Sequence, residues 1–484
     1  MRTTPDAPAR ALPPAARAAA GLLTSLVLAG AAHAQTYAID FVATASHALT
    51  MSRTGEVIVG TTTLAPACDA CPPIFDVPAI WSGGRRQLLA VPEGGSYLAF
   101  AGVNAQGWVA GTAMRLDATG GAGYVWVPRA DGSGHDAVPL GTLAGYADAM
   151  PAGIDDSNRV IGLARTWFVA QDPFTWTMAD GISSLTALGY PADEPVAVSP
   201  GGVVATRTLT YTFGDPGSAS AVAPPPDGFY GNTSTLTGAV NDAGMRASFL
   251  LSTSGTSSAL RYLARYSDAA GWQLLAGPVA SSQPYGIGSV DPAGTITAHL
   301  LNNAYLSPGP DGGAQSLSAM VSPAYPDATV SRAGDIADDG SIVGSAMIGR
   351  SARLVKLRPV VPCTGSCLRV SALDMTGRMI SEPGQPGQCL PGASNDVRAR
   401  ITVVDADGLP VRGATVVGRF LDDYYLDAPV SLRTNRKGQV VARHTGEACV
   451  GAIAFLVEDV RKSGASLDRT AGTLTSWVIP QPRR

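Results

Sequence analysis

The chain has 484 residues, of which 45% are apolar and only 15% are charged, and it contains 56 glycines and 36 prolines. This composition indicates a globular, loop-rich chain that is long enough for more than one domain, and it excludes a disordered tail protein. The formal net charge is −4, and acidic and basic residues are interspersed. Because nucleic acids and anionic membrane surfaces require a basic stripe, we expect neither as a partner.

Residues 1–34 have the three parts of a secretory signal peptide. Three arginines precede the apolar run GLLTSLVLAGAA, and Ala32-His33-Ala34 supplies the small residues that signal peptidase needs. The run is too short to cross roughly 30 Å of hydrocarbon, and no later segment approaches the ~20 apolar residues of a membrane span. We therefore expect an exported protein that is secreted, periplasmic or surface-associated, with a mature chain starting near Gln35.

An even number of cysteines in an oxidising compartment indicates disulfides. The six cysteines are Cys68, Cys71, Cys363, Cys367, Cys389 and Cys449. Proximity favours pairing Cys68 with Cys71 and Cys363 with Cys367, which leaves Cys389 for Cys449. A metal site or a redox CxxC is the alternative, but the first pair stands in a Pro-rich loop and the histidines fall at no ligand spacing. We expect loop-stapling disulfides, no metal and no cofactor.

One short signal recurs seven times along residues 35–358. It consists of an apolar residue, two or three turn-forming residues, a glycine or asparagine, and then an apolar pair, as in VNAQGWVAG and IDDSNRVIG. The turn positions are Gly55, Gly107, Asn158, Gly202, Gly244, Gly294 and Gly340. Their spacing is typical of the blades of a β-propeller.

The order of elements is clearest in the third copy. Ala147 to Ile154 reads as a strand, Asp155 to Asn158 as a turn, and Val160 to Leu163 as the returning strand. The turn position usually requires a positive φ, which glycine adopts freely and asparagine tolerates best among the other residues. Asp and Asn residues just before it can close the turn through their side chains. A third strand with an aromatic residue and a fourth ending in Leu complete a four-stranded blade.

The two ends of the repeat array predict how the ring closes. Tyr37 to Phe41 resembles the fourth strand of a repeat, whereas the last repeat ends one strand short, after Arg353 to Leu357. An N-terminal strand in the last blade would remove two exposed sheet edges. We predict seven blades. Six or eight remain alternatives, because residues 211–230 are rich in Pro, Gly and Ser and blur the fourth period.

After the spacer 359–362 the pattern changes to alternating strands, which predicts a two-sheet sandwich over 363–484. Asp405 to Val416 reads Asp-x-x-Gly-x-Pro-Val-x-Gly-Ala-x-Val and resembles the Ig-like or fibronectin-like modules that end many secreted bacterial proteins. The expected fold is therefore all-β, a seven-bladed propeller followed by an Ig-like sandwich.

The segment from Gly123 to Ala164 resembles the bacterial extracellular HAF repeat. The matching positions are Trp126, Leu140 to Leu143, Gly145, Ile154, Asp155, Val160 and Gly162. The His-Ala-Phe tripeptide of that repeat is replaced here by other residues before the tryptophans. The resemblance implies a secreted repeat protein, and it provides no catalytic residues to carry over.

The sequence lacks the common catalytic motifs. G-x-S-x-G, H-E-x-x-H, the P-loop and G-x-G-x-x-G are all absent. Acid pairs stand at Asp155-Asp156, Asp338-Asp339 and Asp422-Asp423, and two opposed carboxylates could serve a glycoside hydrolase. Because the first two pairs belong to the repeat turn, we interpret them as turn closure.

The aromatic residues divide into two groups. Trp81, Trp126, Trp176 and Trp272 have a fixed place on the third strand, which favours packing between blades. Candidate ligand contacts lie outside that pattern: Trp108, Trp167, Tyr424 and Tyr425. We expect a non-catalytic binding or cell-surface protein with a glycan or an extracellular protein as partner. A polysaccharide-active hydrolase or lyase, or a structural envelope component, is the alternative.

Overall fold

The computed structural model describes residues 35–44, 50–64, 74–93, 95, 97–114, 121–166, 170–231, 238–252, 260–280, 285–309, 312–349, 351–380, 394–422, 428–447 and 451–482. Strands carry nearly all the regular structure in these ranges, and α2 (Leu317–Met320) is the one helix among them. The predicted all-β class is confirmed.

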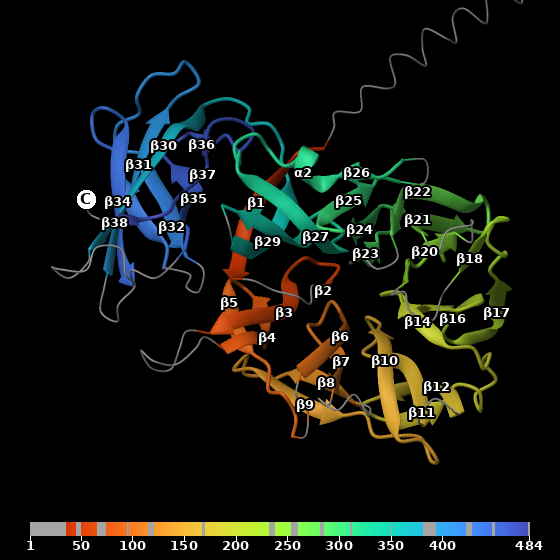
Figure 1. Cartoon of the computed structure of the whole chain (residues 1–484). Coiled ribbons are helices and arrows are strands. Elements are labelled where there is room, and N and C mark those ends of the chain that lie inside the picture. Colours follow the sequence, from red (N-terminus) through yellow and green to blue (C-terminus); the bar gives the residue numbers. More distant parts are fainter. Residues whose placement is uncertain are drawn as a thin grey trace, which may run out of the picture.

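Seven antiparallel sheets follow one another around a ring in the described part of residues 37–359 (Figure 1). The first three are β2 (Thr50–Met51), β3 (Val57–Leu64), β4 (Ile74–Ser82) and β5 (Arg85–Leu88); β6 (Tyr97–Val103), β7 (Val109–Met114), β8 (Gly121–Pro128) and β9 (His135–Pro139); and β10 (Asp148–Ile154), β11 (Val160–Thr166), β12 (Ala170–Thr177) and β13 (Gly181–Ser184). The fourth is β14 (Pro195–Val198), β15 (Val203–Thr206), β16 (Leu209–Thr212) and β17 (Asp215–Ala221).

The remaining three sheets complete the ring. The fifth is β18 (Phe229–Gly231), β19 (Ala239–Val240), β20 (Arg246–Ser252), β21 (Leu260–Ser267) and β22 (Gly271–Ala280), and the sixth is β23 (Tyr285–Val290), β24 (Ile296–Leu300), β25 (Asn303–Ser307) and β26 (Gln315–Ser316). The seventh joins β27 (Ala328–Ile336), β28 (Ile342–Ile348) and β29 (Ser351–Pro359) to β1 (Tyr37–Thr44). Each sheet contains one copy of the repeat.

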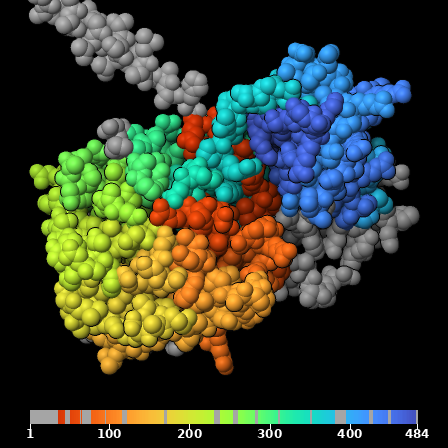
Figure 2. Space-filling model, turned by 180° about the vertical axis from the view of Figure 1, so that it is seen from behind, coloured from red at the N-terminus to blue at the C-terminus, as the bar shows by residue number. Residues whose placement is uncertain are grey.

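The N-terminal strand closes the ring as predicted. β1 pairs antiparallel with β29, with Tyr37 opposite Pro359 and Thr44 opposite Arg353. Figure 2 shows the red N-terminal segment set against the teal residues of the last sheet. The pairing removes the free edge that either strand would otherwise present.

The repeat turns have the predicted backbone conformation. The turn glycines have φ between +72° and +86°, and Asn158 has φ +60°. The residue three positions earlier closes the turn in most copies. Asp155 is an example: its Oδ1 accepts hydrogen bonds from the backbone N–H groups of Ser157 and Arg159, each at 2.9 Å.

The third-strand tryptophans pack between the sheets. Trp126 is fully buried, and Trp81 and Trp176 are also buried. The indole Nε1 of Trp126 donates to the carbonyl oxygen of Ala90 at 3.1 Å. The predicted third-strand position is wrong for Trp272, which stands on β22, the outer strand of the fifth sheet, where it is only partly buried; Tyr266 on β21 has the third-strand position opposite it. Trp272 Nε1 donates to Ala223 O at 2.8 Å. Each indole N–H that becomes buried needs such a partner.

The C-terminal part forms two further sheets beside the seventh sheet (Figure 1). One contains β30 (Cys367–Ile380), β31 (Ser394–Val404), β34 (Gln439–Glu447), β36 (Ser466–Leu467) and β38 (Gln481–Pro482), and the other contains β32 (Thr415–Leu421), β33 (Val430–Arg433), β35 (Ile453–Arg461) and β37 (Thr475–Val478). Cys363 and Cys367 form a disulfide, as predicted. Cys68, Cys71, Cys389 and Cys449 lie outside the described residues.

The C-terminal sheets share a hydrophobic core with the ring. One continuous cluster of buried residues runs from the sixth and seventh sheets into both C-terminal sheets. Leu474 N donates to Ala324 O at 2.6 Å, and Ser322 Oγ donates to Arg469 O at 2.5 Å. The Arg469 guanidinium also lies 3.5 Å from Asp40 Oδ1 on β1. The two parts are therefore joined by buried packing as well as by the chain.

Candidate functional site

A central channel runs through the ring and encloses a cavity of about 440 Å³. All seven repeats contribute to its wall through the inner strand of each sheet, and five of them also contribute through the turn that follows it. Because the repeats are equivalent, the wall is built from rings of residues that occupy the same position in successive repeats. Three of these rings define the chemistry of the channel.

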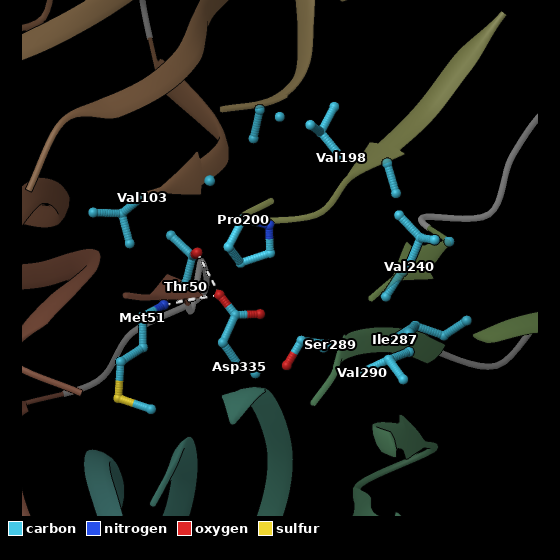
Figure 3. A pocket seen from close by; sticks show the side chains of 18 of the residues that line it. Thr50, Met51, Val103, Val198, Pro200, Val240, Ile287, Ser289, Val290 and Asp335 are labelled. Atoms are coloured by element: carbon cyan, nitrogen blue, oxygen red, sulfur yellow. Dashed lines mark hydrogen bonds between the residues drawn. The ribbon is translucent and has the colours of Figure 1, made fainter. Parts of the chain in front are cut away.

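The first ring is apolar and consists of the leading residue of each repeat signal. Its members are Met51, Val103, Ile154, Val198, Val240, Val290 and Ile336. These side chains surround the channel just inside the repeat turns, and several of them are labelled in Figure 3. The apolar start of the signal, which reads as an ordinary core position, therefore also forms the wall of a cavity.

The second ring lies one residue earlier and is polar in one sector only. Its members are Thr50, Gly102, Gly153, Ala197, Ala239, Ser289 and Asp335. Ser289, Asp335 and Thr50 come from the sixth, seventh and first sheets, which are neighbours in the closed ring. Glycine and alanine occupy the other sector. The channel thus has a polar side that faces small residues.

The inner strands are irregular at this level. β6, β10, β14, β23 and β27 each change register at or directly before the second ring. In β27 the shift falls between Ala333 and Ile336, so that it includes Asp335. A bulge bends its strand and redirects side chains. This local geometry accounts for Asp335 and its neighbours lining the channel together.

Asp335 is held through one of its two carboxyl oxygens. Thr50 Oγ1 donates to Asp335 Oδ2 at 2.5 Å, and the backbone N–H of Met51 donates to the same oxygen at 2.9 Å. Figure 3 shows the second carboxyl oxygen directed away from Thr50 and Met51, on the side of Ser289. The Ser289 hydroxyl oxygen accepts a hydrogen bond from Ile336 N at 2.8 Å, and its own proton remains available to a further acceptor.

The carboxyl group of Asp335 has no ion-pair partner among the residues that the structure describes. Its burial in the channel raises its pKa to about 6, while the hydrogen bonds from Thr50 and Met51 oppose that rise. At pH 7 the group is therefore mainly ionised, in apolar surroundings and without a cation. Buried carboxylates in proteins are normally paired.

The third ring belongs to the turns at one mouth of the channel, and five of its seven members line the cavity. Its members are Arg53, Ala105, Asp156, Pro200, Asp242, Pro292 and Asp338. Arg53 Nε donates to Asp338 Oδ2 at 2.9 Å, and Arg53 Nη1 lies 3.6 Å from Asp156 Oδ2 and 3.9 Å from Asp242 Oδ2. The hydrogen bond to Asp338 raises the pKa of Arg53. One cation thus joins turns from four sheets across this mouth.

Further from the turns, the wall carries His299 on β24 and Arg332 on β27. Burial, together with the positive charge of Arg332, lowers the pKa of His299 to about 4. The imidazole is therefore neutral at pH 7, and its Nδ1 is buried without a hydrogen-bond partner. This end of the cavity carries a cation, whereas the level of Asp335 carries an anion.

The two residues of each acid pair in the repeat turns have different contacts. Asp155 and Asp339 close their turns, the latter by accepting from Ser341 N at 2.8 Å. Their neighbours Asp156 and Asp338 instead contact Arg53 at the channel mouth. Turn closure is thus right for one residue of each pair and incomplete for the other. Asp422 lies in the C-terminal part, where its carbonyl oxygen accepts from Arg353.

The aromatic candidates do not gather at the channel. Trp108 is partly buried against the core cluster between the second and third sheets, and its backbone N–H donates to Asn104 Oδ1 at 3.0 Å. It is not part of the channel wall. Trp167, Tyr424 and Tyr425 lie outside the described residues. Sequence reasoning missed Asp335 and Arg53. An alignment of the seven turns marks Asp335 as the one charged residue of its ring and Arg53 as the one basic residue of its ring.

Among the described residues, no group of three or more His, Cys, Asp or Glu side chains is placed to hold a metal ion. In the same part of the chain, no helix has the length and apolar character to cross a bilayer.

No protein-family model matches the chain, and no curated protein matches it. Among solved structures, the β-propeller domain of the Trilobed protease from Pyrococcus furiosus shares 10% identity at a TM-score of 0.35, covering 67% of this chain and 94% of that one. An α-L-arabinanase from Penicillium chrysogenum, complexed with arabinobiose, shares 12% identity at a TM-score of 0.33, covering 67% and 98%. Likeness at this level says nothing about the activity of this chain.

Proposed function

We propose that the protein is an exported, non-catalytic binding protein that takes its ligand, or one end of it, into the central channel. The observation that carries this proposal is the channel wall: an apolar ring beside a ring with a single polar sector around Asp335. Ligand sites are mostly apolar cavities with a few convergent polar groups. The signal peptide and the likeness to HAF repeats and Ig-like modules support an extracellular setting.

The charged groups favour binding over catalysis. Asp335 is the one carboxyl group on the inner strands of the described wall. The other three belong to the turns: Asp242 and Asp338 lie against Arg53, and Asp291 accepts from Thr295 N at 2.7 Å. A glycoside hydrolase needs two carboxyl groups on either side of the bond that it cleaves. Aromatic faces suited to sugar stacking are also scarce, since Phe100 is the one aromatic residue in the described wall.

The proposal is tested with a variant that fills the channel. A Cβ at Gly102 would have Ile154 Cγ2 as its nearest neighbour, at 3.8 Å, so Gly102→Leu fits the backbone and narrows the cavity. Gly313→Leu is the matched control, because a Cβ there meets nothing within 4 Å. Residues 35–484 of each form are screened against arrays of glycans, peptides and small metabolites.

We expect a saturable ligand of the wild type and of Gly313→Leu that Gly102→Leu loses. A ligand that all three forms bind equally would place the binding site outside the channel and refute the proposal. Turnover of a bound polysaccharide by the wild type would replace it with the hydrolase or lyase alternative.

A further inference from the structure

The polar sector of the channel has an unmatched charge. Asp335 is mainly ionised at pH 7. One of its oxygens already accepts two hydrogen bonds, and its other oxygen faces the cavity (Figure 3). Neither arginine of the described wall pairs with Asp335. Arg53 contacts three turn aspartates, and Arg332, three residues earlier on β27, is not among the groups that act on the Asp335 carboxyl. A cation that balances Asp335 has to come from a ligand.

The hydrogen-bonding geometry selects the kind of cation. A guanidinium binds a carboxylate best through both oxygens, but Asp335 Oδ2 already accepts from Thr50 and Met51. A quaternary ammonium has no N–H donor and is held by aromatic cages, whereas the wall offers one phenylalanine. A primary ammonium has three donors in a compact group. It can reach the free oxygen of Asp335 and the remaining lone pair of Ser289 Oγ.

The rest of the wall selects the body that carries the ammonium group. Next to Asp335 lie the side chains of the apolar ring, and opposite it lie Gly102, Gly153, Ala197 and Ala239. The small residues leave space for a ligand beside Asp335. Because the apolar ring surrounds this space, an aliphatic group is favoured there over one that carries hydroxyl groups. Resting on the proposed channel function, we infer that the ligand presents a primary ammonium group on an aliphatic body, with the ammonium nitrogen at Asp335.

The test compares hexylamine with hexan-1-ol, which has the same aliphatic body but no charge. Binding to residues 35–484 is measured by calorimetry at pH 7.5 and low salt. Because a hydrogen bond to a charged group is worth more than one between neutral groups, we expect hexylamine to bind at least about tenfold more tightly. Nα-acetyl-lysine amide is the second probe: tight binding of it indicates a lysine side chain as the source, and binding of hexylamine alone indicates a free amine.

Two variants separate the charge from the local structure. Asp335→Asn keeps an acceptor oxygen for Thr50 and Met51 but removes the charge, and we expect it to bind hexylamine no better than hexan-1-ol. Thr50→Val removes one hydrogen bond and keeps the carboxylate, so it should retain the preference for the amine. An equal loss in Thr50→Val and Asp335→Asn would refute the inference, because the effect would then be structural.

The result also distinguishes this inference from the channel function on which it rests. If the wild type binds hexylamine and hexan-1-ol equally and Gly102→Leu binds neither, the channel binds ligands but the ammonium assignment is wrong. If Gly102→Leu binds hexylamine as the wild type does, both the ammonium assignment and the channel function are wrong. Circular dichroism confirms that each variant is folded.

Discussion

Arg53 Nε donates to Asp338 Oδ2 at 2.9 Å, across 285 positions of the chain. The two residues occupy the same position in the first and last repeat turns, and Asp338 N also donates to Arg53 O at 2.8 Å. The same guanidinium lies within 4 Å of Asp156 and Asp242. Closure of the ring thus brings three carboxylates around one cation at the channel mouth.

Replacing Arg53 by methionine should leave three carboxylates facing one another at that mouth. The groups are partly exposed and screened by solvent, so we expect a loss of about 1 kcal/mol in the free energy of unfolding at low salt. The loss should shrink in 1 M NaCl, where the Debye length is about 3 Å. Urea denaturation at both salt concentrations measures it. The control is Arg129→Met, which breaks an exposed pair with Asp136, and equal losses in the two variants would contradict the prediction.

The pH dependence of stability should report Asp335. Its pKa is raised from 3.8 to about 6 in the folded protein, so between these values the folded state retains a proton that the unfolded state has lost. The contribution of Asp335 to stability therefore falls as the pH rises through this window, by roughly 3 kcal/mol at most. Asp335→Asn has no such titration, so its free energy of unfolding should rise relative to that of the wild type between pH 4 and pH 7.

Urea titrations of both proteins at several pH values test this expectation. His299 has a lowered pKa in the folded state and contributes equally to both proteins, so that its effect cancels in the difference. Parallel curves for the wild type and Asp335→Asn would show that the carboxyl group titrates normally.

The positive φ of the repeat turns should make alanine costly there. Gly244 has φ +77°, and a Cβ would find Thr210 Cγ2 at an ordinary 3.6 Å, so Gly244→Ala tests the backbone conformation alone. We expect a loss of about 1–2 kcal/mol in the free energy of unfolding. Gly313→Ala, at a glycine outside the left-handed region and with open space around it, should change little. Chemical denaturation measures the free energy of unfolding of both variants. Similar losses in Gly244→Ala and Gly313→Ala would rule out the conformational explanation.

Removing the C-terminal sheets should destabilise the ring. The core cluster is continuous between the two parts, and Trp477 lies so close to Gly349 that a Cβ there would meet its Cγ at 3.0 Å. A chain of residues 35–362 would expose this surface to water. We expect a lower Tm than for residues 35–484 and binding of a hydrophobic dye. An unchanged Tm without dye binding would show that the ring is stable by itself.

The turn chemistry could be read from single repeats because it is local. Positive φ at Gly55 or Asn158 follows from the residues of that turn alone, as does closure by Asp155. The joining of β1 to β29 also followed from the sequence, because an unmatched strand stood at each end of the array. Asp335 escaped the same reasoning, since its importance lies in a comparison with six residues from other repeats.

The amino-acid sequence by itself determined the period, the strands, the turns and the strand that closes the ring, since these depend on backbone preferences and on alternation within some fifty residues. Only the tertiary structure decided which equivalent positions face the channel and which charges meet there. Ring closure places Ser289, Asp335 and Thr50 side by side and sets Arg53 among aspartates of three other turns. These contacts between residues of different repeats depend on how the whole ring closes, whereas turns and strands depend on residues that are neighbours in the chain.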